Sequence, residues 1–158
     1  MVESTSRPGL PVLVALALAL AACEQLPPTL TLDLTVSEEG NSLRVQGTTD
    51  LPDGALLTYE VRHEQLEHDT ETPIDMLYTE GTFEVEDGRF GGPIDLSLFD
   101  AGPVDVMVAF QMDLPGDQVQ PRAIRSRFGE HGELLAGSNV STNDGGERRV
   151  AVVQAVDR

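Results

Sequence analysis

The segment from residue 64 to residue 75 holds the densest group of side chains that could do chemistry. It carries five carboxylates and no arginine: Glu64, Glu67, Asp69, Glu71 and Asp75. Carboxylates on a loop can gather a divalent metal such as calcium, which takes hard oxygen ligands at loose geometry. No Asp-x-Asp-x-Asp-Gly order occurs here, so we favour a solvated acidic loop. A divalent-cation or small-ligand site in 64–75 is the alternative.

The histidines around this segment come close to a zinc-protease motif and miss it. The run is His63-Glu64-Gln65-Leu66-Glu67-His68, whereas His-Glu-x-x-His needs histidine where Glu67 stands. His63 is also expected to end a strand, so the helical spacing that brings two ligands together is missing. The sequence has no Gly-x-Ser-x-Gly elbow either. We therefore predict no catalytic residue, no cofactor-binding residue and no enzyme.

Three arginines lie close together at positions 122, 125 and 127. Guanidinium groups at this spacing could clamp an acidic ligand or a phosphate. Pairing with the protein's own carboxylates is the favoured interpretation, because the chain is so acidic.

Composition excludes several classes of protein. The 158 residues include 27 acidic and 10 basic ones, the basic ones all arginine, for a net charge of -17. This charge repels phosphate backbones and anionic headgroups, which disfavours nucleic-acid binding and electrostatic membrane docking. A single cysteine excludes a disulfide framework and a thiolate-rich zinc site. The hydrophobic content of 40% suits one folded domain.

The N-terminal region has the layout of a signal peptide. Thirteen apolar residues run from Leu10 to Ala22, and Arg7 is the one basic residue before them. A membrane-spanning helix needs about 20 apolar residues, so this stretch fits a signal-peptide h-region instead. We assign residues 1–22 to the signal peptide and residues 23–28 to a short tether.

The end of this stretch, Leu20-Ala21-Ala22-Cys23, resembles the lipobox of bacterial lipoproteins. The resemblance implies a cut before Cys23 and lipid on its thiol and amine, so that the chain reaches its membrane partner through this residue. Two or three acyl chains would give a stable anchor. It also implies an extracytoplasmic place in a bacterial cell envelope. Glu24 stands where aspartate resembles an inner-membrane retention signal, which favours the outer membrane where a cell has two.

The rest of the chain, 29–158, is predicted to be one all-β domain. Apolar and polar residues alternate from Thr29 to Val36, as expected of a half-buried strand. Similar runs follow at 43–47, 57–61, 83–85, 89–98, 104–112 and 148–156. Asp87-Gly88 between two of them predicts a hairpin with a type I′ turn. About seven strands separated by turns indicate an antiparallel β-sandwich.

A family resemblance refines this fold class. The turn Gly47-Thr48-Thr49-Asp50-Leu51-Pro52-Asp53-Gly54 and the residues after it resemble uncharacterised secreted domains of the immunoglobulin-like and fibronectin-III-like type. With the Asp-Gly hairpin and Ala101-Gly102-Pro103, the resemblance spans roughly Leu30 to Met112. It implies an immunoglobulin-like sandwich and carries no assigned activity.

The stretch from Asp113 to Glu147 is predicted to be a long connection before the last strand. Residues 121–128 are expected to form a short helix with Ala123, Ile124 and Phe128 inward, and an extra short strand is expected near Leu134.

Counting strands gives an orientation for the domain. If the strands alternate in direction from the tether, connections 37–42, 64–80 and 99–103 lie far from the membrane, and 113–146 faces it. We therefore expect a lipid-anchored binding, adhesive or structural envelope module with a protein partner in the envelope or on the cell surface. The acid excess also resembles proteins of high-salt environments, and codon bias explains it equally well.

Overall fold

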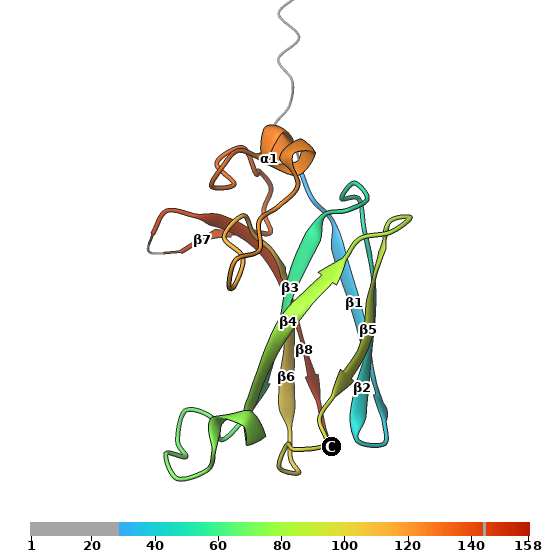
Figure 1. Cartoon of the computed structure of the whole chain (residues 1–158), viewed down its shortest axis with the longest axis vertical. Coiled ribbons are helices and arrows are strands. Elements are labelled where there is room, and N and C mark those ends of the chain that lie inside the picture. Colours follow the sequence, from blue (N-terminus) through green and yellow to red (C-terminus); the bar gives the residue numbers. More distant parts are fainter. Residues whose placement is uncertain (1–28, 144) are drawn as a thin grey trace, which may run out of the picture.

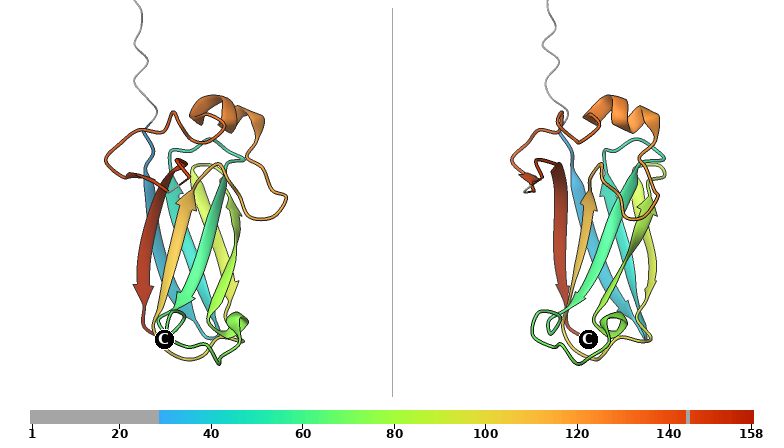
Figure 2. Two further views of the ribbon diagram at one scale, coloured as in Figure 1. Left: turned by 90° about the vertical axis from the view of Figure 1, so that its left-hand side faces the viewer. Right: turned by 60° about the vertical axis from the view of Figure 1, so that its left-hand side comes forward.

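The computed structural model describes residues 29–143 and 145–158, which form two antiparallel β-sheets packed face to face (Figures 1 and 2). Three predictions lie outside these residues: the signal peptide over 1–22, the lipidation site Cys23 and the tether over 23–28. Within the part of the chain that is described, no helix is long and apolar enough to cross a membrane.

Eight strands make up the two sheets in the described residues. Their bounds are β1 (Leu32–Glu39), β2 (Ser42–Thr49), β3 (Leu56–His63), β4 (Tyr78–Glu84), β5 (Arg89–Asp95), β6 (Val104–Phe110), β7 (Val140–Thr142) and β8 (Arg148–Val156). A 3-10 turn spans Ile74–Met76, and the helix α1 spans Arg122–Phe128. One sheet has the strand order β1-β2-β5 and the other has β4-β3-β6-β8-β7.

The core fills the space between the sheets with side chains from alternate positions. Leu43 of β2, Leu57 of β3 and Val106 of β6 are completely buried, as the period of two along a strand requires. Three rings form a chain through this layer. Tyr59 and Phe83 stack at 4.7 Å between centroids, and Phe83 lies 6.4 Å from Phe90.

The predicted all-β sandwich is confirmed, with differences in detail. The extra short strand is β7, which pairs with β8, while Leu134 lies in a turn and is 48% exposed. The short helix is present and buries Ile124 and Phe128, but Ala123 is exposed. The alternating run predicted over 89–98 ends early: β5 stops at Asp95 and the chain turns, so Leu98 is 65% exposed.

The Asp87-Gly88 turn forms as predicted, with φ of 50° and 70°. The strands that it joins do not make a long hairpin, however. Beside the turn, the two segments are joined only by a bridge between Glu86 and Arg89. The strand before the turn, β4, belongs to one sheet, and the strand after it, β5, belongs to the other. The turn is therefore a corner through which the chain passes between the layers.

The connections collect at the two ends of the sandwich (Figures 1 and 2). At one end the backbone N–H of Leu96 donates to Asn41, and that of Asp100 donates to Met76. These bonds tie three connections together. At the other end α1 lies near the start of β1 (Figure 1), and the Asn139 amide donates to the Leu30 carbonyl at 2.8 Å.

Two glutamines hold segments that no β-ladder joins. The Gln154 side chain accepts from the N–H of Val36 and donates to its carbonyl, which bridges β8 to β1 across the seam between the sheets. Gln120, which is 1% exposed, accepts from the N–H of Leu56 and donates to the carbonyls of Leu56 and Gln111. This fully bonded amide fixes the long connection against the sandwich.

Candidate functional site

The acidic segment 64–75 forms an irregular loop between β3 and β4. Its backbone folds through successive turns, in which the N–H of Leu66 donates to His63 and those of His68 and Asp69 donate to Gln65. Four of its five carboxylates are exposed and one, Asp69, is half-buried. The loop lies at the end of the sandwich opposite α1 (Figure 1).

The loop carboxylates do not converge. In residues 29–143 and 145–158, no three His, Cys, Asp or Glu side chains are placed to hold a metal ion together. Asp69 is engaged locally: its oxygens accept from the N–H groups of Glu71 and Thr72 and from the Thr72 hydroxyl. These bonds, led by the Thr72 hydroxyl, hold the pKa of Asp69 below its ordinary value. The cation-binding alternative for Glu64, Glu67, Asp69, Glu71 and Asp75 stays a prediction.

His63 has a structural setting. It ends β3 as predicted and is 2% exposed. Its Nδ1 accepts from the N–H of Gln65 at 3.2 Å, which leaves Nε2 to donate to the Ala101 carbonyl at 3.4 Å. His68 is exposed on the loop, so the two histidines do not share a site.

The arginine cluster lies on α1. Arg125 pairs with Glu130, with Nη1 and Oε2 3.1 Å apart, and the Arg127 guanidinium lies 5.0 Å from the Phe128 ring centroid. Arg122 is exposed. Among the described residues, the predicted pairing with a carboxylate therefore holds for Arg125, while Arg127 contacts an aromatic ring instead.

The outer face of β4 and β3 places two carboxylates opposite each other. Glu60 and Glu80 are cross-strand partners, a repulsive arrangement on a sheet. Arg62 bonds to Glu60, and the Tyr78 hydroxyl donates to Glu80 at 2.6 Å. Burial, together with this bond to Glu80, raises the pKa of Tyr78 far above its ordinary value. The bonds from Arg62 and Tyr78 thus offset the repulsion between Glu60 and Glu80.

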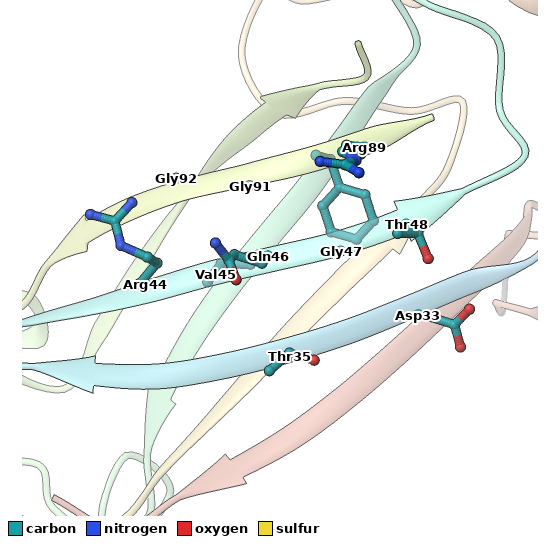
Figure 3. A pocket seen from close by; sticks show the side chains of 11 residues that line it. Asp33, Thr35, Arg44, Val45, Gln46, Gly47, Thr48, Arg89, Gly91 and Gly92 are labelled. Carbon is teal, nitrogen blue, oxygen red and sulfur yellow. The ribbon is translucent and has the colours of Figure 1, made fainter. Parts of the chain in front are cut away.

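A hollow of about 500 Å³ lies on the outer face of the β1-β2-β5 sheet (Figure 3). The strand register arranges its side chains in rows across the three strands. One row is Asp33, Thr48 and Arg89, the next is Thr35, Gln46 and Gly91, and the third carries Arg44 beside Pro93. Polar side chains thus border a position that has no side chain at all.

Gly91 opens the centre of this hollow. Its φ is 130°, and a Cβ there would overlap the Val45 carbonyl oxygen, so neither the backbone nor the space admits another residue. Val45 and Phe90 are buried beneath the sheet, which leaves backbone as the floor. Figure 3 shows the guanidinium groups of Arg44 and Arg89 on either side of Gly91 and Gly92.

Most polar side chains around the hollow make no hydrogen bond within residues 29–143 and 145–158. Among the residues that the structure describes, the side chains of Asp33, Thr35, Gln46, Thr48 and Arg89 make no hydrogen bond to one another or elsewhere. Arg44 uses Nε to donate to Glu39 Oε1 at 2.6 Å, and this bond raises the pKa of Arg44 above its ordinary value. The Arg44 side chain is also one of those that line the hollow.

The charge balance separates this hollow from three others on the surface. The hollow on the β1-β2-β5 sheet is lined by two arginines, Arg44 and Arg89, and by one carboxylate, Asp33. A hollow near Pro115 is lined by Glu60, Glu80 and Asp113 without arginine, and one beside the Asp87 turn has three carboxylates around Arg89. The hollow of the acidic loop has Asp69 and Glu71. Arginine thus outnumbers carboxylate in the β1-β2-β5 hollow alone of these four.

Sequence patterns do not reveal this hollow. Arg44 and Arg89 are 45 positions apart and belong to no motif. The one available signal was the alternation of β2, which places Arg44, Gln46 and Thr48 on one face. The pairing of β2 with β5, which brings Arg89 beside Thr48, depends on the tertiary fold.

Comparisons with known proteins give little. No protein family and no curated protein matches the chain. One solved structure matches, catalytically inactive OgpA from Akkermansia muciniphila in complex with an O-glycopeptide (glycodrosocin) substrate, at 12% identity and a TM-score of 0.38. The match covers 85% of this chain and 32% of OgpA, so the chain spans about a third of that protein's length.

Proposed function

We propose that this chain is a non-catalytic binding or structural module of a bacterial cell envelope, anchored in a membrane by lipid on Cys23. The support for the anchor is the apolar stretch from Leu10 to Ala22 ending in Leu20-Ala21-Ala22-Cys23. The support for a binding role is an open hollow on the outer face of the β1-β2-β5 sheet, bordered by polar side chains.

The proposal extends to the kind of sandwich. The antibody constant-type arrangement groups strands ABED in one sheet and CFG in the other. Here the first, second and fifth strands share one sheet, while the third, sixth and eighth share the other. The fourth strand pairs with the third instead of the fifth. This order supports an immunoglobulin-like, fibronectin-III-like domain.

The observation that carries the proposal is the separation of the two ends of the molecule. Described residues begin at Thr29, at the end where α1 lies, and the acidic loop lies at the opposite end (Figures 1 and 2). Five residues separate Cys23 from Thr29 and reach at most about 17 Å when extended. A lipid at Cys23 would therefore hold the α1 end close to the bilayer and present the acidic loop outward.

Anchoring is tested by expressing the full chain in a bacterium that acylates lipoproteins. The wild-type chain should incorporate labelled palmitate and partition into the detergent phase. Cys23→Ser should lose both properties while keeping the melting temperature of the sandwich. Equal detergent partitioning of the two chains would contradict the anchor. Glu24→Gln is the matched control and should behave as wild type.

Orientation is tested with cysteines placed at the two ends, since Cys23 is the only natural cysteine. Thr70 of the acidic loop and Ser126 of α1 are both exposed. In proteoliposomes, a bulky maleimide should label Thr70→Cys faster than Ser126→Cys, and the difference should vanish in detergent. Faster labelling at position 126 in the bilayer would reverse the orientation.

A further inference from the structure

The hollow on the β1-β2-β5 face has the donors of an anion site on a strongly acidic protein. From Arg44 to Thr48, the cross-strand partner of Arg89, is four residues along β2. At about 3.3 Å per residue and about 4.8 Å between strands, the two arginine Cα atoms lie roughly 14 Å apart. In Figure 3 the two arginines lie at opposite ends of the stretch that contains Gly91 and Gly92.

Two carboxylates near the Arg44 end of this hollow are engaged elsewhere, whereas Glu84, Glu86 and Asp87 lie around Arg89 in the neighbouring hollow. Glu39 is bonded to Arg44. Asp95, on the same face, accepts from the N–H of Ser97 at 2.9 Å, and this bond lowers the pKa of Asp95. Charges at the far end of the molecule are screened beyond about 8 Å at physiological salt. Within the hollow itself, an approaching anion therefore meets two guanidinium groups and one carboxylate.

Asp33 requires hydrogen-bond donors from a ligand, whereas the two arginines require acceptors. Its carboxylate lies two strands from Arg89 in the same row, about 10 Å away at ordinary strand spacing, and has no side-chain partner among the described residues. It accepts hydrogen bonds only. A ligand that fills the hollow must bring acidic groups to the arginines and hydroxyl donors to Asp33.

We infer that this hollow binds a carboxylated saccharide. Its carboxylates would bind Arg89 and the free Nη atoms of Arg44, and its hydroxyls would bind Asp33, Thr35, Gln46 and Thr48. An acidic peptide fits less well, because the apolar lining residues Val45 and Phe90 are buried beneath the floor and leave no pocket for side-chain anchors. The inference rests on the proposed binding role and names the class of ligand.

The direct test is isothermal titration of the full chain, in neutral detergent, with tetragalacturonate at 0.15 M salt. We expect saturable binding that falls about tenfold or more with the fully methyl-esterified tetrasaccharide, which keeps the hydroxyls and loses the charge. This comparison requires no protein variant. No saturable heat, or equal affinity for the methyl ester, would overturn the inference.

Substitutions of the residues that line the hollow test whether the saccharide binds there. Arg89→Gln and Arg44→Gln should each weaken binding about tenfold, whereas Arg122→Gln, which removes an exposed arginine from α1, should change nothing. Asp33→Asn should weaken binding about threefold, because a saccharide hydroxyl loses its charged acceptor. Stronger binding by Asp33→Asn, an equal loss with Arg122→Gln, or tetraglutamate binding as tightly would each overturn the assignment. The titration is independent of lipid at Cys23, so its failure is distinct from failure of the anchor.

Discussion

Gln120 shows how one side chain can fix a long segment. Its amide makes three hydrogen bonds to the backbone of Leu56 and Gln111 in a fully buried setting. Gln120→Leu leaves those backbone groups without partners, which should lower the free energy of unfolding by about 3 kcal/mol. Urea denaturation measures this change. Gln118→Leu is the control, since Gln118 is exposed, and should shift stability by less than about 0.5 kcal/mol. An equal loss of unfolding free energy in the two variants would contradict this structural role of Gln120.

Asp69 makes the stability of the acidic loop depend on pH. Its pKa is lowered, first by the Thr72 hydroxyl and then by the N–H groups of Thr72 and Glu71. A lowered folded-state pKa stabilises the fold above the unfolded value of about 3.9. That contribution disappears as pH falls through the folded value.

The measurement is the melting temperature of wild type and Asp69→Ala between pH 2 and pH 7. The wild type should be more stable at neutral pH, and the two curves should converge below pH 4. Glu67→Ala, which removes an exposed carboxylate from the same loop, should run parallel to wild type. A difference for Asp69→Ala that persists unchanged to pH 2 would contradict the role of its charge.

At the scale of elements, the floor of the hollow depends on glycine. Gly91→Ala meets both an unfavourable φ of 130° and the Val45 carbonyl, so it should cost about 3 kcal/mol or more in unfolding free energy. Gly40→Ala is the matched control. Its φ is 64° with open space around it, and it should cost only about 1 kcal/mol. Chemical denaturation measures the unfolding free energy of both variants. A Gly91→Ala protein as stable as Gly40→Ala would contradict the close approach of Gly91 to the Val45 carbonyl.

Sequence patterns predicted those parts of the structure that depend on neighbouring residues. Alternation located seven of the eight strands of the described residues, although β4 begins at Tyr78, before the predicted run at 83–85. Asp87-Gly88 identified a turn that has the expected positive φ values. Local signals did not show that β4 and β5 leave this turn for opposite sheets, because that choice depends on packing across the core. The hollow was missed for the same reason: Arg44 and Arg89 border one hollow only because of the register of β2 and β5.

At the scale of the whole molecule, the net charge of -17 should govern salt dependence. Raising sodium chloride from 0.1 M to 1 M shortens the Debye length from about 10 Å to about 3 Å, which weakens repulsion among the carboxylates. The melting temperature should therefore rise. A chain with Glu64, Glu67 and Glu71 all changed to glutamine should show a shallower rise, and a flat or falling wild-type curve would contradict this account.

Calcium at the same ionic strength separates screening from binding. A ligand selective for the folded state adds about 2.7 kcal/mol at a hundredfold excess over its Kd. A saturable calcium shift beyond the sodium chloride curve would support the cation-binding alternative for the acidic loop.

The claim of a lipid-anchored envelope module depends most directly on Cys23. The decisive measurement is mass spectrometry of the N-terminal peptide from the chain expressed in a lipoprotein-acylating bacterium. The account predicts a mature chain that begins at Cys23 and carries a diacylglycerol on its thiol, recovered from the membrane fraction. A chain with an unmodified Cys23 thiol, recovered from the soluble fraction, would contradict it.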